Sequence, residues 1–301
     1  MTGNRLRKVL AATASVVLIV MMATGVAAED VIFKRQFVDG PHGQLHVLSS
    51  RPVDGAVAAP AVLCLAPNPM AGRYFSRFMA ALGTDREMLA IDYPGNGDSD
   101  APQAALDLAG YADAMAAGLE ALGYGEGGKG PVDLVGYHSG TFVGVELAVR
   151  RPDLVRRVIL SGVPFYLGEE RQKQYDQTVV YTPLSEDFAS IAHWWEFTVS
   201  HRQDGVELSR AYTNFIDVLK TMDHHEWLYG AVFEYPADER AAELEQPVLI
   251  LNTHGGLKDQ SREFAKYLPN VELIEIPELH HGVYDVGADN LAARSRAFLD
   301  R

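Results

Sequence analysis

Cysteine and positive charge are the two scarce features of this 301-residue sequence. Its one cysteine, Cys64, lies in the apolar run 61–65, so no intramolecular disulfide bond can form and a buried thiol is predicted. Lysine and arginine number 26 against 40 aspartate and glutamate residues, which gives a formal net charge of −14. Nucleic acids and anionic lipid surfaces bind to basic faces that replace their counterions. The acidic balance therefore argues against both as partners.

A phosphate-binding loop is missing as well, although residues 123–130 come close to one. Their sequence, Gly-Tyr-Gly-Glu-Gly-Gly-Lys-Gly, places Gly130 where the loop needs a metal-binding serine or threonine. Such a loop also leaves a strand and opens a helix, whereas this stretch follows a predicted helix and enters a predicted strand. We therefore expect no nucleotide site here.

The first 28 residues have the pattern of a secretory signal peptide. Three basic residues among the first eight precede an apolar run over 9–28, which ends in Val-Ala-Ala before Glu29. Cleavage at this junction would remove three positive charges and change the formal charge from −14 to −17. An uncleaved membrane anchor is the alternative, because about 20 apolar residues can span a bilayer. In both cases we expect the folded body outside the cytoplasm, periplasmic or secreted if the signal is removed.

The rest of the chain predicts an α/β protein with a full core, since 48% of the whole sequence is hydrophobic. Short apolar runs alternate with amphipathic stretches, a pattern typical of a mostly parallel sheet covered by helices on both faces. Eight strands are predicted, the first two as a hairpin: 31–38, 44–49, 61–65, 88–92, 132–135, 155–160, 247–251 and 271–276. Helices are predicted near 74–83, 106–122, 141–150, 259–268 and 288–300.

The stretch 167–243 breaks this alternation, because it has a helical pattern and is rich in tryptophan and histidine. We predict a helical cap inserted after the sixth strand, so that residues 29–166 and 244–301 form the α/β core. A cap closes on a sheet through an apolar face, and most of its aromatic residues are expected to pack. The candidates for lining a pocket are Trp194, Trp195, Trp227 and Tyr229.

Residues 134–140, Leu-Val-Gly-Tyr-His-Ser-Gly, connect a predicted strand to a predicted helix. This setting is typical of a nucleophile elbow, a strained turn that raises one side chain above the sheet. Small residues two positions before and after the raised residue let strand and helix pack closely. Gly136 and Gly140 meet this requirement only if His138 is raised, in the place where a serine enzyme has its serine. Ser139 would then begin the helix.

With this elbow the chain resembles the α/β-hydrolase superfamily, specifically a bacterial branch whose elbow reads Gly-Tyr-His-Thr/Ser-Gly. Two further motifs carry the resemblance: Asp-Tyr-Pro-Gly-Asn-Gly-Asp-Ser at 92–99, after the fourth strand, and Arg-Arg-Pro-Asp-Leu-Val at 150–155, leading into the sixth. The likeness covers nearly all of residues 35–301. It implies an eight-stranded, mostly parallel α/β-hydrolase sheet with an inserted helical cap.

The resemblance assigns the triad histidine to His281, in the Leu-His-His-Gly stretch after the last strand. The acid partner would stand four or five residues beyond the seventh strand, where this chain has Gly256. Asp259 is the nearest substitute, although it could instead cap the helix predicted to follow it.

The same resemblance places the oxyanion donors on the backbone N–H groups of Asn68 and Ser139. Asn68 lies in Leu-Ala-Pro-Asn-Pro at 65–69, and the two prolines of this loop have no N–H to donate.

Three functional hypotheses fit the sequence. The first is a hydrolase, or a related lyase, of a small apolar ester-like molecule, with a non-standard catalytic set formed by His138, His281, Ser139 and Asp259. The second is a small-molecule binding protein of the same fold whose catalytic machinery has decayed, which His138 and Gly256 favour.

The third hypothesis is a metal site. His138, His254, His280 and His281 all follow strands at one edge of the sheet, where a metal could join three of them. Imidazoles from different loops often lie together without ligand geometry, however. We expect no metal and no cofactor, a small molecule as the partner, and a membrane as a partner only if the N-terminal segment stays uncleaved.

Overall fold

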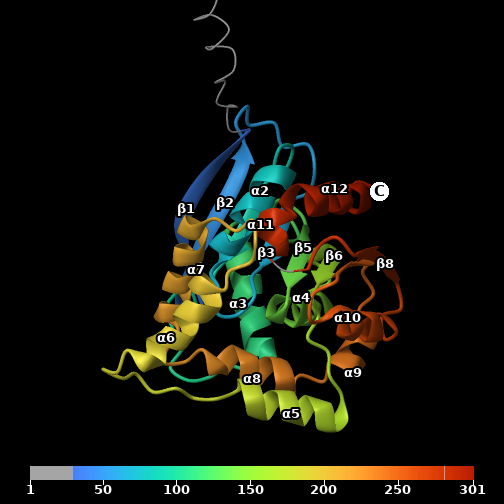
Figure 1. The fold of residues 1–301 in the computed structure, drawn as a ribbon. Coiled ribbons are helices and arrows are strands. Elements are labelled where there is room, and N and C mark those ends of the chain that lie inside the picture. The colour runs from blue at the N-terminus through green and yellow to red at the C-terminus, as the bar shows by residue number, and fades with distance from the viewer. Residues whose placement is uncertain (1–29, 281) are drawn as a thin grey trace, which may run out of the picture. The chain divides into compact units, whose positions relative to one another are not determined.

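The computed structural model describes residues 30–280 and 282–301, so the predicted signal segment 1–28 and His281 lie outside the described residues. Within them eight strands form one sheet in the order β1-β2-β4-β3-β5-β6-β7-β8 (Figure 1). The strands are β1 (Val31–Gly40), β2 (Gly43–Pro52), β3 (Val62–Leu65), β4 (Met88–Ile91), β5 (Val132–Tyr137), β6 (Val155–Ser161), β7 (Val248–Thr253) and β8 (Val271–Ile276). The pairs β1–β2 and β2–β4 are antiparallel and all other neighbours are parallel. The prediction of an eight-stranded, mostly parallel sheet is confirmed.

The central strands are buried on both faces, as a parallel sheet between helices requires. In β3, Leu63 and Leu65 belong to one apolar cluster and Val62 and Cys64 to another, because successive side chains point to opposite faces. The first cluster contains side chains of α3 (Leu108–Ala121), α4 (Ser139–Arg150) and α10 (Lys258–Ala265), and the second those of α2 (Ser76–Leu82), α11 (Val283–Val286) and α12 (Ala288–Leu299). Two helical layers therefore cover the sheet.

Between β6 and β7 the chain is helical and contains no strand, and every residue from 162 to 247 is described. The elements are α5 (Gly168–Thr178), α6 (Ala189–Trp195), the π-helical turn η2 (Glu196–Ser200), α7 (Leu208–Lys220), α8 (Glu226–Glu234) and α9 (Ala237–Ala242). Figure 1 shows α5 and α8 below the sheet and α6 and α7 beside it. No helix of the described residues has both the length and the apolar composition of a membrane span.

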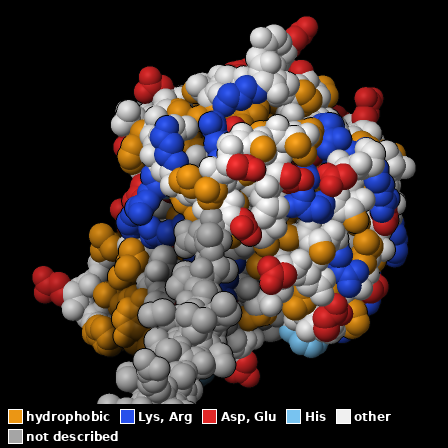
Figure 2. All heavy atoms as spheres, turned by 90° about the horizontal axis from the view of Figure 1, so that it is seen from above, with side chains coloured by type: hydrophobic (Ala, Val, Ile, Leu, Met, Phe, Trp, Pro, Cys, Tyr) orange, Lys and Arg blue, Asp and Glu red, His pale blue; other side chains and the backbone are white. Residues whose placement is uncertain are grey.

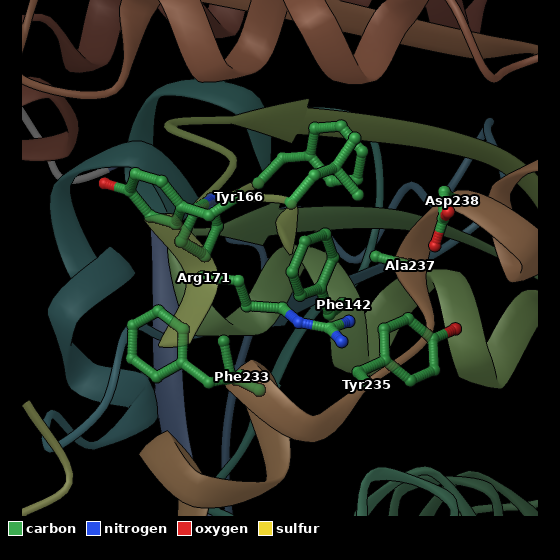
Figure 3. Close-up of a pocket in the computed structure, with 11 residues that line it drawn as sticks. Phe142, Tyr166, Arg171, Phe233, Tyr235, Ala237 and Asp238 are labelled. Carbon is green, nitrogen blue, oxygen red and sulfur yellow. The ribbon is translucent and has the colours of Figure 1, made fainter. Parts of the chain in front are cut away.

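Aromatic side chains from α4 and from the segment between β6 and β7 line a small pocket between the two (Figure 3). Phe142 of α4, Phe233 and Tyr235 line the pocket, and Arg171 of α5 points between their rings. The Tyr235 hydroxyl also donates a hydrogen bond to Glu146 of α4, at 2.9 Å. The insertion is thus anchored on the helix that begins at the predicted elbow.

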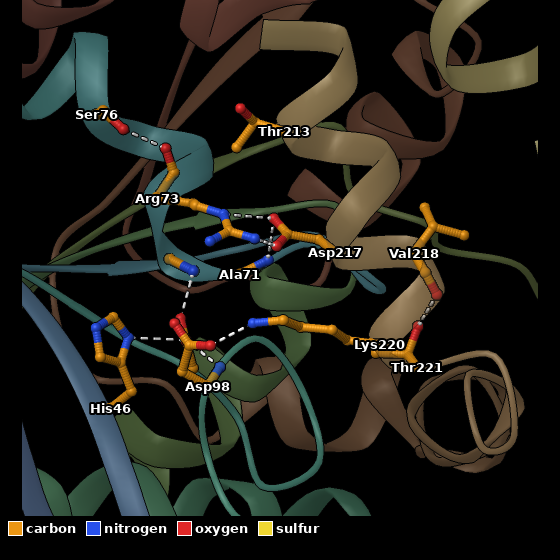
Figure 4. A network of polar contacts seen from close by, with 12 residues as sticks. His46, Ala71, Arg73, Ser76, Asp98, Thr213, Asp217, Val218, Lys220 and Thr221 are labelled. Atoms are coloured by element: carbon orange, nitrogen blue, oxygen red, sulfur yellow. Dashed lines mark hydrogen bonds and ion pairs between the residues drawn. The ribbon is translucent and has the colours of Figure 1, made fainter. Parts of the chain in front are cut away.

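Polar contacts attach α7 to the loop after β3 (Figure 4). The side chain of Asp217 is fully buried and forms an ion pair with Arg73 of η1 (Gly72–Phe75). Asp217 also accepts a hydrogen bond from the Ala71 N–H, at 3.2 Å. One helical turn later, Lys220 pairs with Asp98 of the turn after β4. Two elements of the core therefore hold one face of α7.

Charges of both signs are interspersed on the face of the molecule seen in Figure 2, where hydrophobic side chains gather at the lower left. Many surface charges are paired with a neighbour, for example Arg150 with Asp113 at 2.9 Å and Arg301 with Glu272 at 2.6 Å. Exposed pairs of this kind contribute little stability, about 0–1 kcal/mol each. The buried Asp217 anchor should matter more.

Replacing Asp217 with alanine should lower the free energy of unfolding by about 3 kcal/mol, because Arg73 would lose its buried partner and the Ala71 N–H its acceptor. The matched control is Glu207→Ala, since Glu207 pairs with Arg77 at 2.8 Å but has a side chain 67% exposed. The control should cost less than about 1 kcal/mol. Urea unfolding measures the free energy of unfolding of both variants and the wild type. An equal decrease in the two variants would show that the contacts of Asp217 do not anchor α7.

Candidate functional site

His138 occupies a strained backbone conformation at the end of β5. Its φ of 52° and ψ of −123° make it the one non-glycine residue with positive φ in the described part of the chain. Such strain costs about 1–3 kcal/mol and persists where the surroundings enforce it, often at functional sites. Here the surroundings are glycines: a Cβ on Gly136 would lie 2.5 Å from the Gly140 carbonyl oxygen, and one on Gly140 would lie 2.2 Å from that of Leu65. The structure thus turns His138, and not Ser139, out of the sheet.

Ser139 is fully buried at the first position of α4. Its Oγ accepts a hydrogen bond from the Asn68 N–H at 2.6 Å. This contact occupies one of the two N–H groups expected to bind an oxyanion. The N–H of Ser139 belongs to the first turn of α4, where N–H groups have no acceptor within the helix.

Asn68 uses all of its polar groups to join three parts of the structure. Besides the N–H bound by Ser139, the side-chain Nδ2 donates to the carbonyl of His225 at 2.7 Å and Oδ1 accepts from the Asn96 amide at 3.0 Å. The Asn68 carbonyl accepts a hydrogen bond from the Tyr229 hydroxyl at 2.8 Å. The loop after β3, the elbow, the turn after β4 and the helical insertion therefore meet at this residue.

A cavity of about 530 Å³ opens beside His138, and we call it the elbow cavity. Its size is within the range of small-molecule sites. Core and insertion both contribute to its wall, with Tyr74, Tyr137, Trp194, Phe197, Asn214 and Tyr229 among the lining residues. Tyr74 and Tyr137 stack with ring centroids 5.8 Å apart and form an aromatic floor. Aromatic and apolar side chains therefore line the cavity together with polar and charged ones, Arg202, Gln203 and Asp285 among them.

The four aromatic residues proposed from the sequence divide into two pairs. Trp194 and Tyr229 line the elbow cavity, whereas Trp195 and Trp227 are not among its lining residues. Trp195 packs edge-on against Tyr212 of α7, with centroids 5.1 Å apart. Trp227 packs against His224 at 5.2 Å. The second pair therefore has a packing role, which sequence alone could not separate from a pocket role.

Burial lowers the pKa of His138 to about 4. Its Nδ1 is buried and has no hydrogen-bond partner among the described residues. The imidazole is therefore neutral near pH 7. Burial also raises the pKa of Tyr137 and Tyr229, so both hydroxyls stay protonated and can act as hydrogen-bond donors.

The other predicted site residues lie away from the elbow cavity or outside the described residues. Asp259 is exposed in the first turn of α10 and pairs with Arg262 at 2.7 Å. The N-cap of α10 is Leu257, so Asp259 complements the helix dipole and is not a cap. His281 is outside the described residues, and its distance to any of these groups is not part of the structure.

The described histidines that could have shared a metal have separate partners. His254 donates from Nε2 to Glu275 at 2.8 Å, and the exposed His280 donates from Nδ1 to the His254 carbonyl at 3.2 Å. Neither lines the elbow cavity with His138.

One group among the described residues has ligand atoms close enough for a metal: His46, Asp92 and Asp98. Asp92 already accepts hydrogen bonds from the Gly72 N–H at 2.6 Å, from the Asp98 N–H at 3.0 Å and from His46 at 2.9 Å. Asp98 pairs with Lys220, as Figure 4 shows. These contacts satisfy both carboxylates, so the group fixes the turn after β4 within the fold.

Six polar side chains of the cavity wall were missed from the sequence: Thr198, His201, Arg202, Gln203, Asn214 and Asp285. Asp285 of α11 lines the elbow cavity and is held by Arg210 at 3.0 Å. The position of Asp285 in the segment after the last strand, β8, could have marked it as a candidate from the sequence. Asn214 of α7 has a buried Oδ1 without a partner among the described residues, and nothing in its sequence context distinguishes it.

A family model described as the alpha/beta hydrolase fold matches residues 60–288. The chain belongs to the alpha/beta hydrolase fold family. This confirms the resemblance to the α/β-hydrolase superfamily. A comparison with curated proteins gives no match.

Solved α/β-hydrolase structures resemble this chain over most of its length. One is a hydrolase from Pseudomonas aeruginosa PA01, with 16% identity, a TM-score of 0.71 and coverage of 89% of this chain and 99% of that one. An enol-lactonase from Burkholderia xenovorans LB400 has 18% identity, a TM-score of 0.69 and coverage of 88% and 100%. An epoxide hydrolase from Vigna radiata has 17% identity, a TM-score of 0.70 and coverage of 89% and 98%. At these identities the likeness shows the fold alone.

Replacing Ser139 with alanine should lower the free energy of unfolding by about 1–3 kcal/mol, because the buried Asn68 N–H would lose its acceptor. Any hydrolytic activity should survive, since the hydroxyl is turned away from the elbow cavity. Ser161→Ala is the matched control, because Ser161 is also fully buried and its Oγ contacts the Tyr284 hydroxyl at 2.7 Å. Loss of ester hydrolysis in Ser139→Ala alone would identify Ser139 as a nucleophile.

Acidification should destabilise the fold through His138. The unfolded chain binds a proton at this residue below its ordinary pKa of about 6.5, whereas the folded chain does so only near pH 4. Stability is therefore present above pH 6.5 and falls by up to about 3 kcal/mol as the pH drops toward 4. His138→Gln should lose this part of the pH dependence in urea unfolding at pH 7 and pH 4.5, while His193→Gln, at an exposed histidine, should keep it. Identical slopes in all three proteins would contradict a neutral His138 in the folded protein.

Proposed function

We propose that this α/β-hydrolase-fold chain hydrolyses small, mostly apolar ester-like molecules and that His138 takes the place of the serine nucleophile. The observation that carries the proposal is the position of a neutral imidazole on the strained elbow beside the elbow cavity, with an Nδ1 that has no hydrogen-bond partner among the described residues. A neutral imidazole has a free lone pair at the pH where a protonated one has none. The lone pair of His138 is therefore available for nucleophilic attack near pH 7.

In the nucleophilic route the unprotonated ring nitrogen of His138 attacks the ester carbonyl, and the C–O bond to the alcohol part then breaks. The alkoxide takes up the proton that the ring releases from its other nitrogen and leaves as an alcohol, so a neutral acyl-imidazole remains. Water then attacks the acyl carbon, the C–N bond breaks, and the proton lost by the water returns to the ring through His281, which releases the acid and restores the neutral ring. The oxyanion of each step would lie at the N-terminus of α4, where the Ser139 N–H and the helix dipole favour negative charge. His281, which the family resemblance assigns as the triad histidine, would accept the proton of the attacking water.

A non-catalytic binding protein of the same fold is the second candidate. It is favoured by the Asn68 N–H, which donates to Ser139 Oγ and is thereby withdrawn from an oxyanion. The exposed position of Asp259, paired with Arg262, favours it too, because an orienting acid is then lacking at that place. Under this function the elbow cavity would hold a small molecule through its aromatic wall, with His138 as a hydrogen-bond partner.

We also propose that the chain is exported and that its mature form begins near Glu29. The proposal is supported by the basic residues, the apolar run 9–28 and the Val-Ala-Ala sequence that precedes this residue.

Hydrolysis of p-nitrophenyl acetate and butyrate by the wild type, His138→Ala and His281→Ala tests the first candidate. Both variants should lose at least about a hundredfold in kcat/KM, the usual contribution of a positioned base or nucleophile. His42→Ala is the control, because His42 lies in the turn between β1 and β2, does not line the elbow cavity and should keep wild-type rates. Undiminished turnover in His138→Ala would refute the nucleophile, and a wild type that binds but never turns over esters would leave the binding protein.

A further inference from the structure

A second cavity of about 520 Å³ lies next to the elbow cavity, and we call it the cap cavity because the helical insertion lines it. The two cavities share Trp194, Phe197 and Tyr229 as lining residues. Residues that line both spaces form the wall between them. His138 lines only the elbow cavity, so the reacting group would lie on that side of the wall.

The wall is built where α6 passes into the π-helical turn η2. A π turn is rare and often marks a functional position. Here the Thr198 hydroxyl donates to the Trp194 carbonyl at 2.6 Å, which holds the start of the turn. Phe197 of the same turn lies edge-on to Trp194 with ring centroids 6.2 Å apart. Two of the three rings of the wall, those of Trp194 and Phe197, therefore come from the junction of α6 and η2.

Trp194 also packs against a fixed partner across the wall. Its ring lies edge-on to that of His225, with centroids 5.5 Å apart. His225 is buried, and its carbonyl accepts the hydrogen bond from Asn68. By contrast, Phe197 is 64% exposed. Of the three wall residues, Tyr229 is held at its hydroxyl by the Asn68 carbonyl and Phe197 is exposed, whereas Trp194 is the largest side chain between the two cavities.

We propose that Trp194 determines substrate specificity by limiting the length of the apolar chain that the elbow cavity accepts. The ligand class is a carbonyl compound with an unbranched alkyl chain, whose carbonyl lies at His138 and whose chain ends against Trp194. Removing the indole joins the two cavities, and a longer chain then reaches the apolar residues of the cap cavity, Val180 and Ala189 among them. This inference rests on the proposed function for the position of the carbonyl, although its test needs no turnover.

The experiment measures binding of 2-alkanones with 4 to 12 carbons by isothermal titration calorimetry. These ketones have the carbonyl but no leaving group, so a failure of catalysis does not affect the result. Each methylene that enters an apolar cavity strengthens binding about fourfold. In the wild type the affinity should rise with chain length and then level off, whereas in Trp194→Ala the rise should continue over several more methylenes.

Trp195→Ala is the matched control, because Trp195 precedes the same turn and packs on Tyr212 and Phe215 without lining either cavity. It should keep the wild-type length limit. Trp194→Leu retains an apolar side chain of smaller size and serves if the alanine variant fails to fold. A limit that stays the same in both Trp194 variants, or that moves equally in Trp195→Ala, would overturn the proposal. Alkanones that follow the predicted pattern without any ester hydrolysis would refute only the hydrolase function.

Discussion

The close crossing of β5 and α4 is the constraint on which the site depends. A Cβ at Gly140 would lie within 2.2 Å of the Leu65 carbonyl oxygen, so strand, helix and the end of β3 can meet only if this position is glycine. The same requirement holds at Gly136, and the residue midway between the two glycines must take a left-handed conformation. In this chain that residue is histidine. The strained residue therefore carries an imidazole, and it lies directly before α4, whose N-terminus can stabilise negative charge.

Asn68 transmits this geometry to the rest of the cavity wall. Its backbone and side chain bind Ser139, Asn96, His225 and Tyr229, residues that come from the elbow, a core turn and two places in the helical insertion. Buried polar groups destabilise a fold unless they are hydrogen-bonded, and each polar group of Asn68, on the backbone and on the side chain, has a partner. The arrangement stabilises a defined position of the insertion over the elbow. It also leaves the Asn68 N–H bound to Ser139 Oγ, whereas the family resemblance implies that this N–H is free to bind an oxyanion.

The proposed chemistry follows from the environment of His138. It does not follow from the similar solved structures, whose sequences are less than one-fifth identical to that of this chain. An imidazole whose pKa lies near 4 stays uncharged across the neutral range. It can enter an aromatic-walled cavity without the cost of burying an ion. A cavity with an uncharged imidazole, protonated tyrosines and several aromatic lining residues is consistent with the neutral ester or ketone that we propose.

The sequence by itself determined the sheet and the elbow. A buried parallel strand appears in the sequence as a short apolar run, and a crowded strand-to-helix turn requires glycines at a fixed spacing. Both patterns involve residues close together in the sequence, so they can be identified without the structure. Tertiary structure alone decided which groups meet. The contact between Asn68 and Ser139 joins residues 71 positions apart, and no local pattern records that the hydroxyl takes this N–H. Trp194 and Trp195 are adjacent and chemically identical. Trp194 nevertheless lines the elbow cavity, whereas Trp195 packs against Tyr212 and Phe215, because the packing of α6 against its neighbours sets the direction of each side chain.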